Sequence, residues 1–137
     1  MTIKNVTYSD GRQVWYENEK IHRENAPAVI YPSGKVEWWS NNKLHRENAP
    51  AVIFPNGDEY WFKNGKCHRN DGPAVIYANG RQEWYKNSIL HRDGGPARIS
   101  PNGRQEWFVN GNRHREDGPA VIAADGSQEW WINGKQK

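Results

Sequence analysis

The sequence contains little of the material from which a thick globular core is built. Only 35% of its 137 residues are hydrophobic and the mean hydropathy is −1.09, so a conventional two-layer interior is not expected. The single cysteine, Cys67, rules out an intramolecular disulfide and predicts a reducing, cytoplasmic location. No apolar stretch approaches the length of a membrane span, and the first residues lack the hydrophobic segment of a secretory signal. We therefore expect neither a membrane span nor a disulfide scaffold.

Dense basic blocks are missing as well. A net charge of +3 and a pI near 9.0 predict a mild attraction to polyanions. The lysines and arginines are dispersed, whereas a dedicated nucleic-acid binder concentrates them in clusters. Net charge therefore does not identify a partner.

What the chain has in abundance is one segment, His-Arg followed by a proline five residues after the histidine. It recurs every 23 residues without insertion, and all five histidines of the protein belong to it. They are His22, His45, His68, His91 and His114, each followed by arginine at 23, 46, 69, 92 and 115. A strict period of this kind is typical of repeat architectures, in which one unit stacks on copies of itself. We expect residues 1–137 to form a single repeat domain of six hairpin units.

Each unit has the pattern of a β-hairpin. Short runs such as 74–77 and 81–85 flank an Asn-Gly or similar turn, in which glycine supplies the positive φ. An asparagine after each second run predicts another tight turn, and the proline excludes a helix through the connection. The sequence thus predicts an all-β array of about twelve short strands.

Aromatic residues occupy two adjacent positions in every second strand. Because neighbouring strand residues point to opposite faces, both faces of the sheet should carry an aromatic row. One row is Trp15, Trp38, Trp61, Trp84, Trp107 and Trp130, and the other is Tyr16, Trp39, Phe62, Tyr85, Phe108 and Trp131.

The run Glu-Trp-Trp-Ile-Asn-Gly-Lys at 129–135, the Asp/Asn-Gly turns and the 23-residue period resemble the MORN repeat. The likeness is greatest to the variant found in bacterial antitoxin-like and in viral or phage proteins, and it covers essentially the whole chain. It implies hairpins laid side by side in a single-layer sheet, and a role in protein interaction. The His-Arg-x-x-Gly/Ala-Pro-Ala connection departs from the family pattern, where the second half of the repeat is rich in glycine.

The histidine row does not predict a metal or catalytic centre. Successive histidines should lie two strands, or ~9.6 Å, apart, whereas zinc ligands all lie within about 2.0–2.3 Å of the ion. No serine or cysteine recurs beside them to act as a nucleophile. We expect no cofactor, no metal and no enzymatic activity, and we expect each imidazole to bond a neighbouring connection.

The arginine row allows two interpretations. The arginines could pair with glutamates that share one position of the repeat, namely Glu37, Glu83, Glu106 and Glu129. Alternatively, an arginine row beside aromatic rings could hold an acidic protein surface or phosphates. The leading hypothesis is a non-enzymatic protein-binding module, such as an antitoxin, an immunity protein or a phage inhibitor of a host factor. The second hypothesis is a sponge that captures nucleotides or nucleic acid through its Arg and Trp rows.

Departures from the repeat concentrate around the fourth connection. Ser88-Ile89 replaces an Asn-Gly-Lys-like turn, Gly94 replaces Asn or Asp, Arg98 replaces valine and Ser100 replaces an aromatic. An unpaired charge in a buried valine position would be costly, so Arg98 is expected to be exposed. The predicted partner-binding residues are Arg69, Arg92, Arg98, Arg115, Trp84 and Trp107. The terminal strands, near 6–8 and 130–131, are expected to be free edges through which copies of the chain could associate.

Removing residues 120–137 should weaken the protein without abolishing its fold, because repeat arrays are stabilised by the sum of unit and neighbour terms. Thermal melts followed by circular dichroism would check this. Complete unfolding of the truncated chain would indicate that the first and last strands depend on each other.

Overall fold

The computed structural model describes residues 2–137, and these residues contain strands and turns but no helix. The predicted all-β array of short antiparallel hairpins is therefore confirmed. Contacts divide the chain into two compact units, one ending at Lys66 and the other running from Cys67 to Lys137. Each is described separately below. Within residues 2–137, no helix offers the length and apolarity needed to cross a membrane.

The first unit is an antiparallel meander in the order β1-β2-β4-β5-β8-β9, with β3 paired to the far end of β2 and β6 paired to β7. Its strands are β1 (Ile3–Thr7), β2 (Gln13–Glu17), β3 (Lys20–Ile21), β4 (Val29–Ile30), β5 (Val36–Glu37), β6 (Trp39–Ser40), β7 (Lys43–Leu44), β8 (Val52–Ile53), β9 (Glu59–Tyr60) and β10 (Phe62–Lys63).

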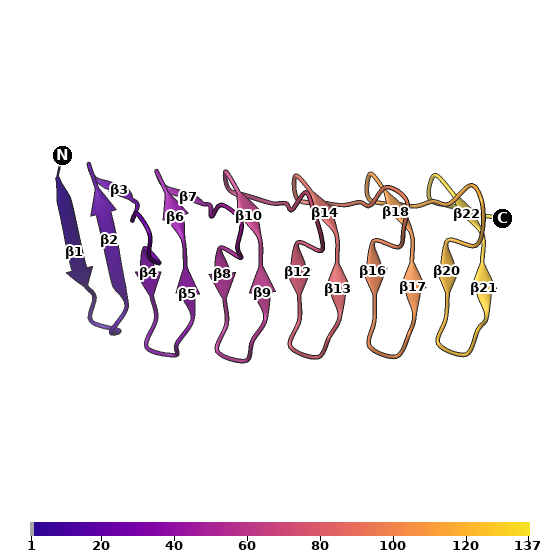
Figure 1. Ribbon diagram of the computed structural model, residues 1–137, viewed down its shortest axis with the longest axis horizontal. Coiled ribbons are helices and arrows are strands. Elements are labelled where there is room, and N and C mark those ends of the chain that lie inside the picture. The colour runs from indigo at the N-terminus through magenta and orange to yellow at the C-terminus, as the bar shows by residue number, and fades with distance from the viewer. Residues whose placement is uncertain (1) are drawn as a thin grey trace. The chain divides into compact units, whose positions relative to one another are not determined.

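The second unit repeats this plan in the order β12-β13-β16-β17-β20-β21. Its strands are β12 (Val75–Ile76), β13 (Gln82–Glu83), β14 (Tyr85–Lys86), β15 (Ile89–Leu90), β16 (Arg98–Ile99), β17 (Gln105–Glu106), β18 (Phe108–Val109), β19 (Asn112–Arg113), β20 (Val121–Ile122), β21 (Gln128–Glu129), β22 (Trp131–Ile132) and β23 (Lys135–Gln136), while β11 (Lys66–Cys67) lies at the boundary. In each unit the hairpin turns lie at one end of the strands and the connections at the other (Figure 1).

Two kinds of turn set this geometry. In the first, the backbone N–H of Gly80 donates to the carbonyl of Tyr77 over 2.9 Å, and Gly80 has a φ of 96°. In the second, Asn87 and Ser88 have φ values of 50° and 66°, the paired positive angles of a type I′ hairpin turn. The predicted Asn turns are thus present, and Ser88 preserves the geometry without glycine. Its hydroxyl also accepts the N–H of Cys67 at 3.0 Å.

The register separates two chemically different faces. Val75 and Arg98 both lie opposite Glu83, and Arg98 also lies opposite Glu106. Residues paired across a ladder share a face, so we call the side that carries Glu37, Glu83, Glu106 and Glu129 the glutamate face. Because residues alternate along a strand, the tryptophans of the first aromatic row lie on the opposite side, the tryptophan face. Both predicted aromatic rows are present.

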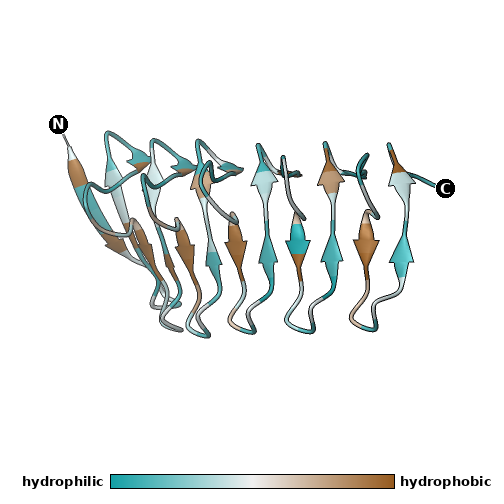
Figure 2. Cartoon of the chain, turned by 45° about the vertical axis from the view of Figure 1, so that its right-hand side comes forward, coloured by the Kyte–Doolittle hydropathy of each residue, from teal (hydrophilic) through white to brown (hydrophobic). Residues whose placement is uncertain are grey.

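The core is thin and consists of small residues. Ala28, Ala51, Ala74, Ala97 and Ala120 are 0% exposed, and Val121, at 1%, is the largest side chain within residues 2–137 that is less than 2% exposed. Hydrophobic strands such as β12 alternate with hydrophilic strands such as β13, as the colouring in Figure 2 shows. Val14, Val29, Val52 and Val75 are 3–5% exposed and complete this apolar layer, so the buried hydrophobic side chains are alanines and valines.

The two outermost strands have partners on one side only. In the part of the chain that the structure describes, β1 pairs with β2 and β21 pairs with β20 in the main sheet path, and neither has a second neighbour there. The free edge predicted near residues 6–8 is confirmed, but the edge predicted at 130–131 is wrong: Trp131 lies in β22, which pairs with β23, and its carbonyl accepts the N–H of Arg115, so the free edge is β21. Self-association through these edges remains a prediction.

Cys67 should resist thiol–disulfide exchange in the native protein. Burial, together with the nearby charge of Glu83, raises the pKa of its thiol to about 12, so almost no thiolate, the reactive form, is present at pH 8. Ellman's reagent should react slowly with the native chain and rapidly in denaturant. Equal rates in both conditions would contradict the burial of this side chain.

Candidate binding surfaces

Each histidine links its repeat to the next one through a hydrogen bond that we call the histidine clip. The Nδ1 atom of each accepts the backbone N–H of the turn asparagine in the next repeat, at 2.9–3.1 Å. The pairs are His22 with Asn41, His45 with Asn64, His68 with Asn87, His91 with Asn110, and His114 with Asn133. The structural role expected of the histidines is confirmed, and the partner is the asparagine turn.

This bond also determines the tautomer. Because Nδ1 accepts an N–H, the proton of the neutral ring must be on Nε2. In His22, Nε2 lies 3.2 Å from Glu17 and 2.7 Å from Glu24, and the ligand atoms of the three residues lie within 4.8 Å of one another. For Nε2 to bind a metal, its proton would have to move to Nδ1, where Asn41 already donates. The geometry therefore favours a hydrogen-bonded cluster over a metal site.

Arginines that follow the histidines are held between a tryptophan ring and a proline carbonyl. Arg92 lies 4.0 Å above the ring of Trp84 and donates from Nη1 to the carbonyl of Pro96 at 3.0 Å. The same stack forms in Arg23 on Trp15, Arg46 on Trp38, and Arg115 on Trp107. Burial of the guanidinium lowers the pKa of Arg92 and that of Arg46. A cation–π contact of this kind contributes about 0.5–2 kcal/mol.

The predicted pairing of these arginines with the glutamate row is wrong. The arginines stack on the tryptophan face, whereas the glutamates lie on the opposite face of the same strands. The carboxylates that do pair with this row come from its own connections, as Asp71 does with Arg69 at 3.0 Å and Asp117 with Arg115 at 3.2 Å.

Grooves lie between successive connections on the tryptophan face. In the second unit, a groove of about 620 Å³ is lined by Trp84 together with the His68 and His91 connections. The next groove, of about 550 Å³, is lined by Trp107 and the His91 and His114 connections. In the first unit, Trp38 lines an equivalent groove of about 530 Å³. The repeat thus produces similar grooves in both units, with two neighbouring ones in the second unit.

Most of the exposed charges beside these grooves are carboxylates, and the exposed Lys86 in the first groove is the exception. The side chains of Glu24, Glu47, Asp71, Asp93, Glu116 and Asp117 are between 71% and 91% exposed. In contrast, the Arg69 and Arg115 side chains are 20% and 24% exposed. We call these six carboxylates the acidic rim.

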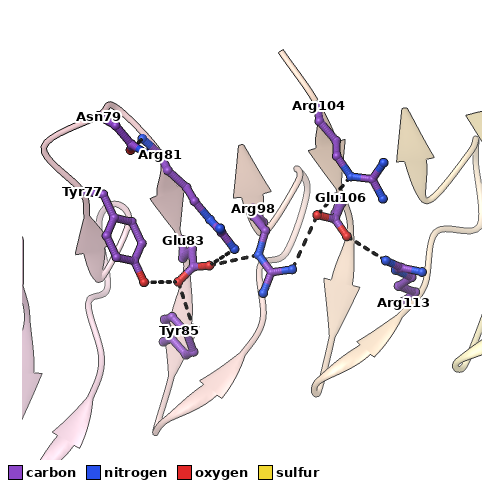
Figure 3. A network of polar contacts seen from close by, with 9 residues as sticks. All are labelled: Tyr77, Asn79, Arg81, Glu83, Tyr85, Arg98, Arg104, Glu106 and Arg113. Atoms are coloured by element: carbon purple, nitrogen blue, oxygen red, sulfur yellow. Dashed lines mark hydrogen bonds and ion pairs between the residues drawn. The ribbon is translucent and has the colours of Figure 1, made fainter. Parts of the chain in front are cut away.

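The glutamate face buries carboxylates instead. Glu83 is 3% exposed and accepts hydrogen bonds from Tyr77, Tyr85, Arg81 and Arg98 (Figure 3). Burial, the charge of Glu83 and the hydrogen bond to it raise the pKa of Tyr85 to about 12. A buried carboxylate is tolerated only when it is paired and hydrogen-bonded, and this network satisfies that requirement.

Arg98 is only a quarter exposed, so the prediction of a free surface arginine is wrong. Its Nε atom lies 3.0 Å from Glu83 and its Nη1 atom lies 3.5 Å from Glu106. The guanidinium of Arg98 therefore bridges carboxylates from the two strands on either side of its own. Burial of the Arg98 guanidinium is tolerated because the strands on both sides supply a negative charge.

The predicted binding residues therefore separate into two groups. The grooves of the second unit bring together Arg69, Arg92, Arg115, Trp84 and Trp107, while Arg98 lies on the glutamate face. Sequence reasoning missed the acidic rim and the convergence of Arg104 and Arg113 on Glu106. The signal for Arg113 was its place in a position that holds Ile21, Leu44 and Leu90 elsewhere.

No family model matches the chain, and a search of curated proteins finds no match. The function must therefore be inferred from the geometry of these two surfaces.

Stability should fall in acid through Glu106. Burial alone raises the pKa of this carboxyl, but the hydrogen bond from Arg113 and the charges of Arg98 and Arg104 outweigh burial and hold it below its ordinary value. A depressed pKa stabilises the fold above the unfolded-state pKa of about 4.3, and this contribution is lost as the pH falls through the lower folded-state pKa.

Glu106→Gln should therefore destabilise the protein at pH 7 by about 1–3 kcal/mol. The difference in melting temperature from the wild type should narrow between pH 6 and pH 3. A difference that stays constant over this range would show that the carboxylate charge does not contribute.

Proposed function

We propose that this protein is a non-enzymatic binding module that recognises another protein through the grooved tryptophan face. The observation that carries the proposal is the repetition of one groove design, with a stacked Arg-Trp floor and exposed carboxylates beside it. Repeated concave sites on a rigid array suit an extended partner segment, because each repeat can take one or a few side chains. The resemblance to MORN repeats supports the same class of function.

The charge of the acidic rim favours a basic partner. The arginine and tryptophan rows predict a partner with an acidic or aromatic-accepting surface, but Arg92 and Arg115 are already engaged by a ring and a carbonyl. The rim carboxylates each contact a histidine or an arginine of their own connection, but Asp93, Glu116 and Asp117 are 88%, 83% and 91% exposed, so solvent and a partner can reach their remaining oxygens. Complementary potentials steer association and select partners, so we propose a lysine- or arginine-rich segment as the ligand of this face.

The same charges disfavour nucleic acid on the tryptophan face. Affinity for a polyanion requires several unneutralised cations along its path, whereas the exposed charges beside the grooves are carboxylates, apart from Lys86 in the first groove. An antitoxin, an immunity protein or a phage inhibitor acting in the cytoplasm on a basic target fits this proposal, and the single cysteine is compatible with that location.

Neutralising the rim of one groove should weaken such binding. The variant Asp93→Asn, Glu116→Gln, Asp117→Asn should lose at least tenfold in affinity for a ten-residue Arg/Lys-rich peptide, or about 1.4 kcal/mol. Its melting temperature should hardly change, because exposed ion pairs contribute little to stability. Calorimetric titration at low salt would measure both affinities.

A matched control removes three other negative charges, which lie outside the rim. Asp10→Asn, Glu19→Asn and Asp125→Asn place residues that equivalent positions already hold, such as Asn102 and Asn42. This control should bind like the wild type. Preference for a glutamate-rich peptide or for a single-stranded oligonucleotide on this face would contradict the proposal.

A further inference from the structure

A second surface, on the glutamate face of the second unit, collects more positive charge than its carboxylates neutralise. Glu106 is 4% exposed and lies in contact with three guanidiniums. Arg113 donates to its Oε2 atom at 3.0 Å, and both Arg98 and Arg104 approach its Oε1 atom at 3.5 Å (Figure 3). With Arg81 and Glu83, the cluster holds four guanidiniums against two carboxylates.

Two of the three arginines around Glu106, Arg98 and Arg113, are departures from the repeat, whereas Arg104 has the counterparts Arg81 and Arg12. The preceding repeat has Val75, Tyr77 and Leu90 where this one has Arg98, Ser100 and Arg113. In that repeat, Tyr77 donates its hydroxyl to Glu83. Ser100 is too short to do the same for Glu106, and arginines take over. The three departures are separated in the sequence, but all of them change the surroundings of one carboxylate, that of Glu106.

The guanidiniums retain hydrogen-bonding capacity. Each carries five N–H donors in a planar fork, whereas contacts to the two carboxylates occupy only one or two nitrogens of each. The side chains of Arg98, Arg104 and Arg113 are 25%, 34% and 31% exposed, so solvent reaches them. Since Arg98 and Arg104 approach the same oxygen atom, one tetrahedral anion could contact both.

We propose that Arg98, Arg104 and Arg113 form a binding site for a phosphate dianion, such as inorganic phosphate or the phosphate monoester of a mononucleotide. The buried Glu106 holds the three guanidiniums close together, which reduces the ordering cost of binding. The cluster's positive excess supplies the attraction, and bidentate N–H pairs match phosphate oxygens.

Aromatic rings beside the cluster favour the nucleotide. Arg98 lies 5.4 Å from the centre of the Phe108 ring and Arg113 lies 5.1 Å from that of Trp131. In the earlier repeats the residue after the first strand of the hairpin is aromatic, as Tyr77 is. The last two repeats have the small residues Ser100 and Ala123 at this position. A base could stack on such a ring, a contact that contributes about 1–3 kcal/mol in nucleic-acid complexes.

Titration of the full chain followed by ¹H–¹⁵N NMR, including the arginine Nε–H signals, would test the site. Inorganic phosphate and adenosine monophosphate should both shift the signals of Arg98, Arg104 and Arg113, while adenosine should not. Tenfold tighter binding of the nucleotide would identify it as the ligand type, and equal affinities would identify phosphate alone. Absence of shifts at 10 mM phosphate and nucleotide would overturn the proposal.

The test variant is Arg98→Val, Ser100→Tyr, Arg113→Leu, which copies the preceding repeat and so supplies Glu106 with a tyrosine hydroxyl. It should fold and lose at least tenfold in phosphate affinity. A control, Lys20→Gln with Lys43→Gln, also removes two positive charges, but from exposed positions outside the cluster. This control should bind phosphate like the wild type. Equal binding by the test variant would refute the site. Because the cluster lies opposite the grooves, these results are independent of binding by the tryptophan face.

Discussion

The stacking of arginine on tryptophan is the contact on which the rest of the molecule depends. A sheet one layer thick leaves its aromatic rings half exposed, and the connections cover them only because each guanidinium lies about 4 Å above a ring and donates to a proline carbonyl. The connection that this stack holds down also carries the histidine clip and the acidic rim. Within residues 2–137, Trp130 has no arginine stacked on its ring, and this residue is 46% exposed.

The two faces show different solutions to one physical problem, which is how a chain poor in aliphatic residues excludes water. On the tryptophan face, cations cover rings. On the glutamate face, rings and cations cover carboxylates, as with Tyr77, Tyr85 and Arg98 around Glu83. Both solutions depend on hydrogen bonds being satisfied, because an unpaired group in either layer would cost about 1–3 kcal/mol.

Much of the fold could be predicted because period and strand alternation determine it. The hairpins, the asparagine turns and the two aromatic rows all follow from positions in the repeat. The partners of Arg92 could not be predicted, since Glu83 and Trp84 are adjacent in sequence and the period does not say over which face the connection folds. Arg98 was misjudged for another reason. A lone charge in a valine position is costly, but the register places Glu83 and Glu106 directly across from it.

The histidine clip joins residues that are always 19 positions apart and never reaches past the next repeat. Every clip is therefore indifferent to how many repeats lie on either side of it. A duplication or deletion of one whole 23-residue segment would leave the bonding pattern of the remaining repeats intact. The number of grooves can then change in evolution by simple recombination, so that the reach of the binding surface varies while its chemistry is preserved.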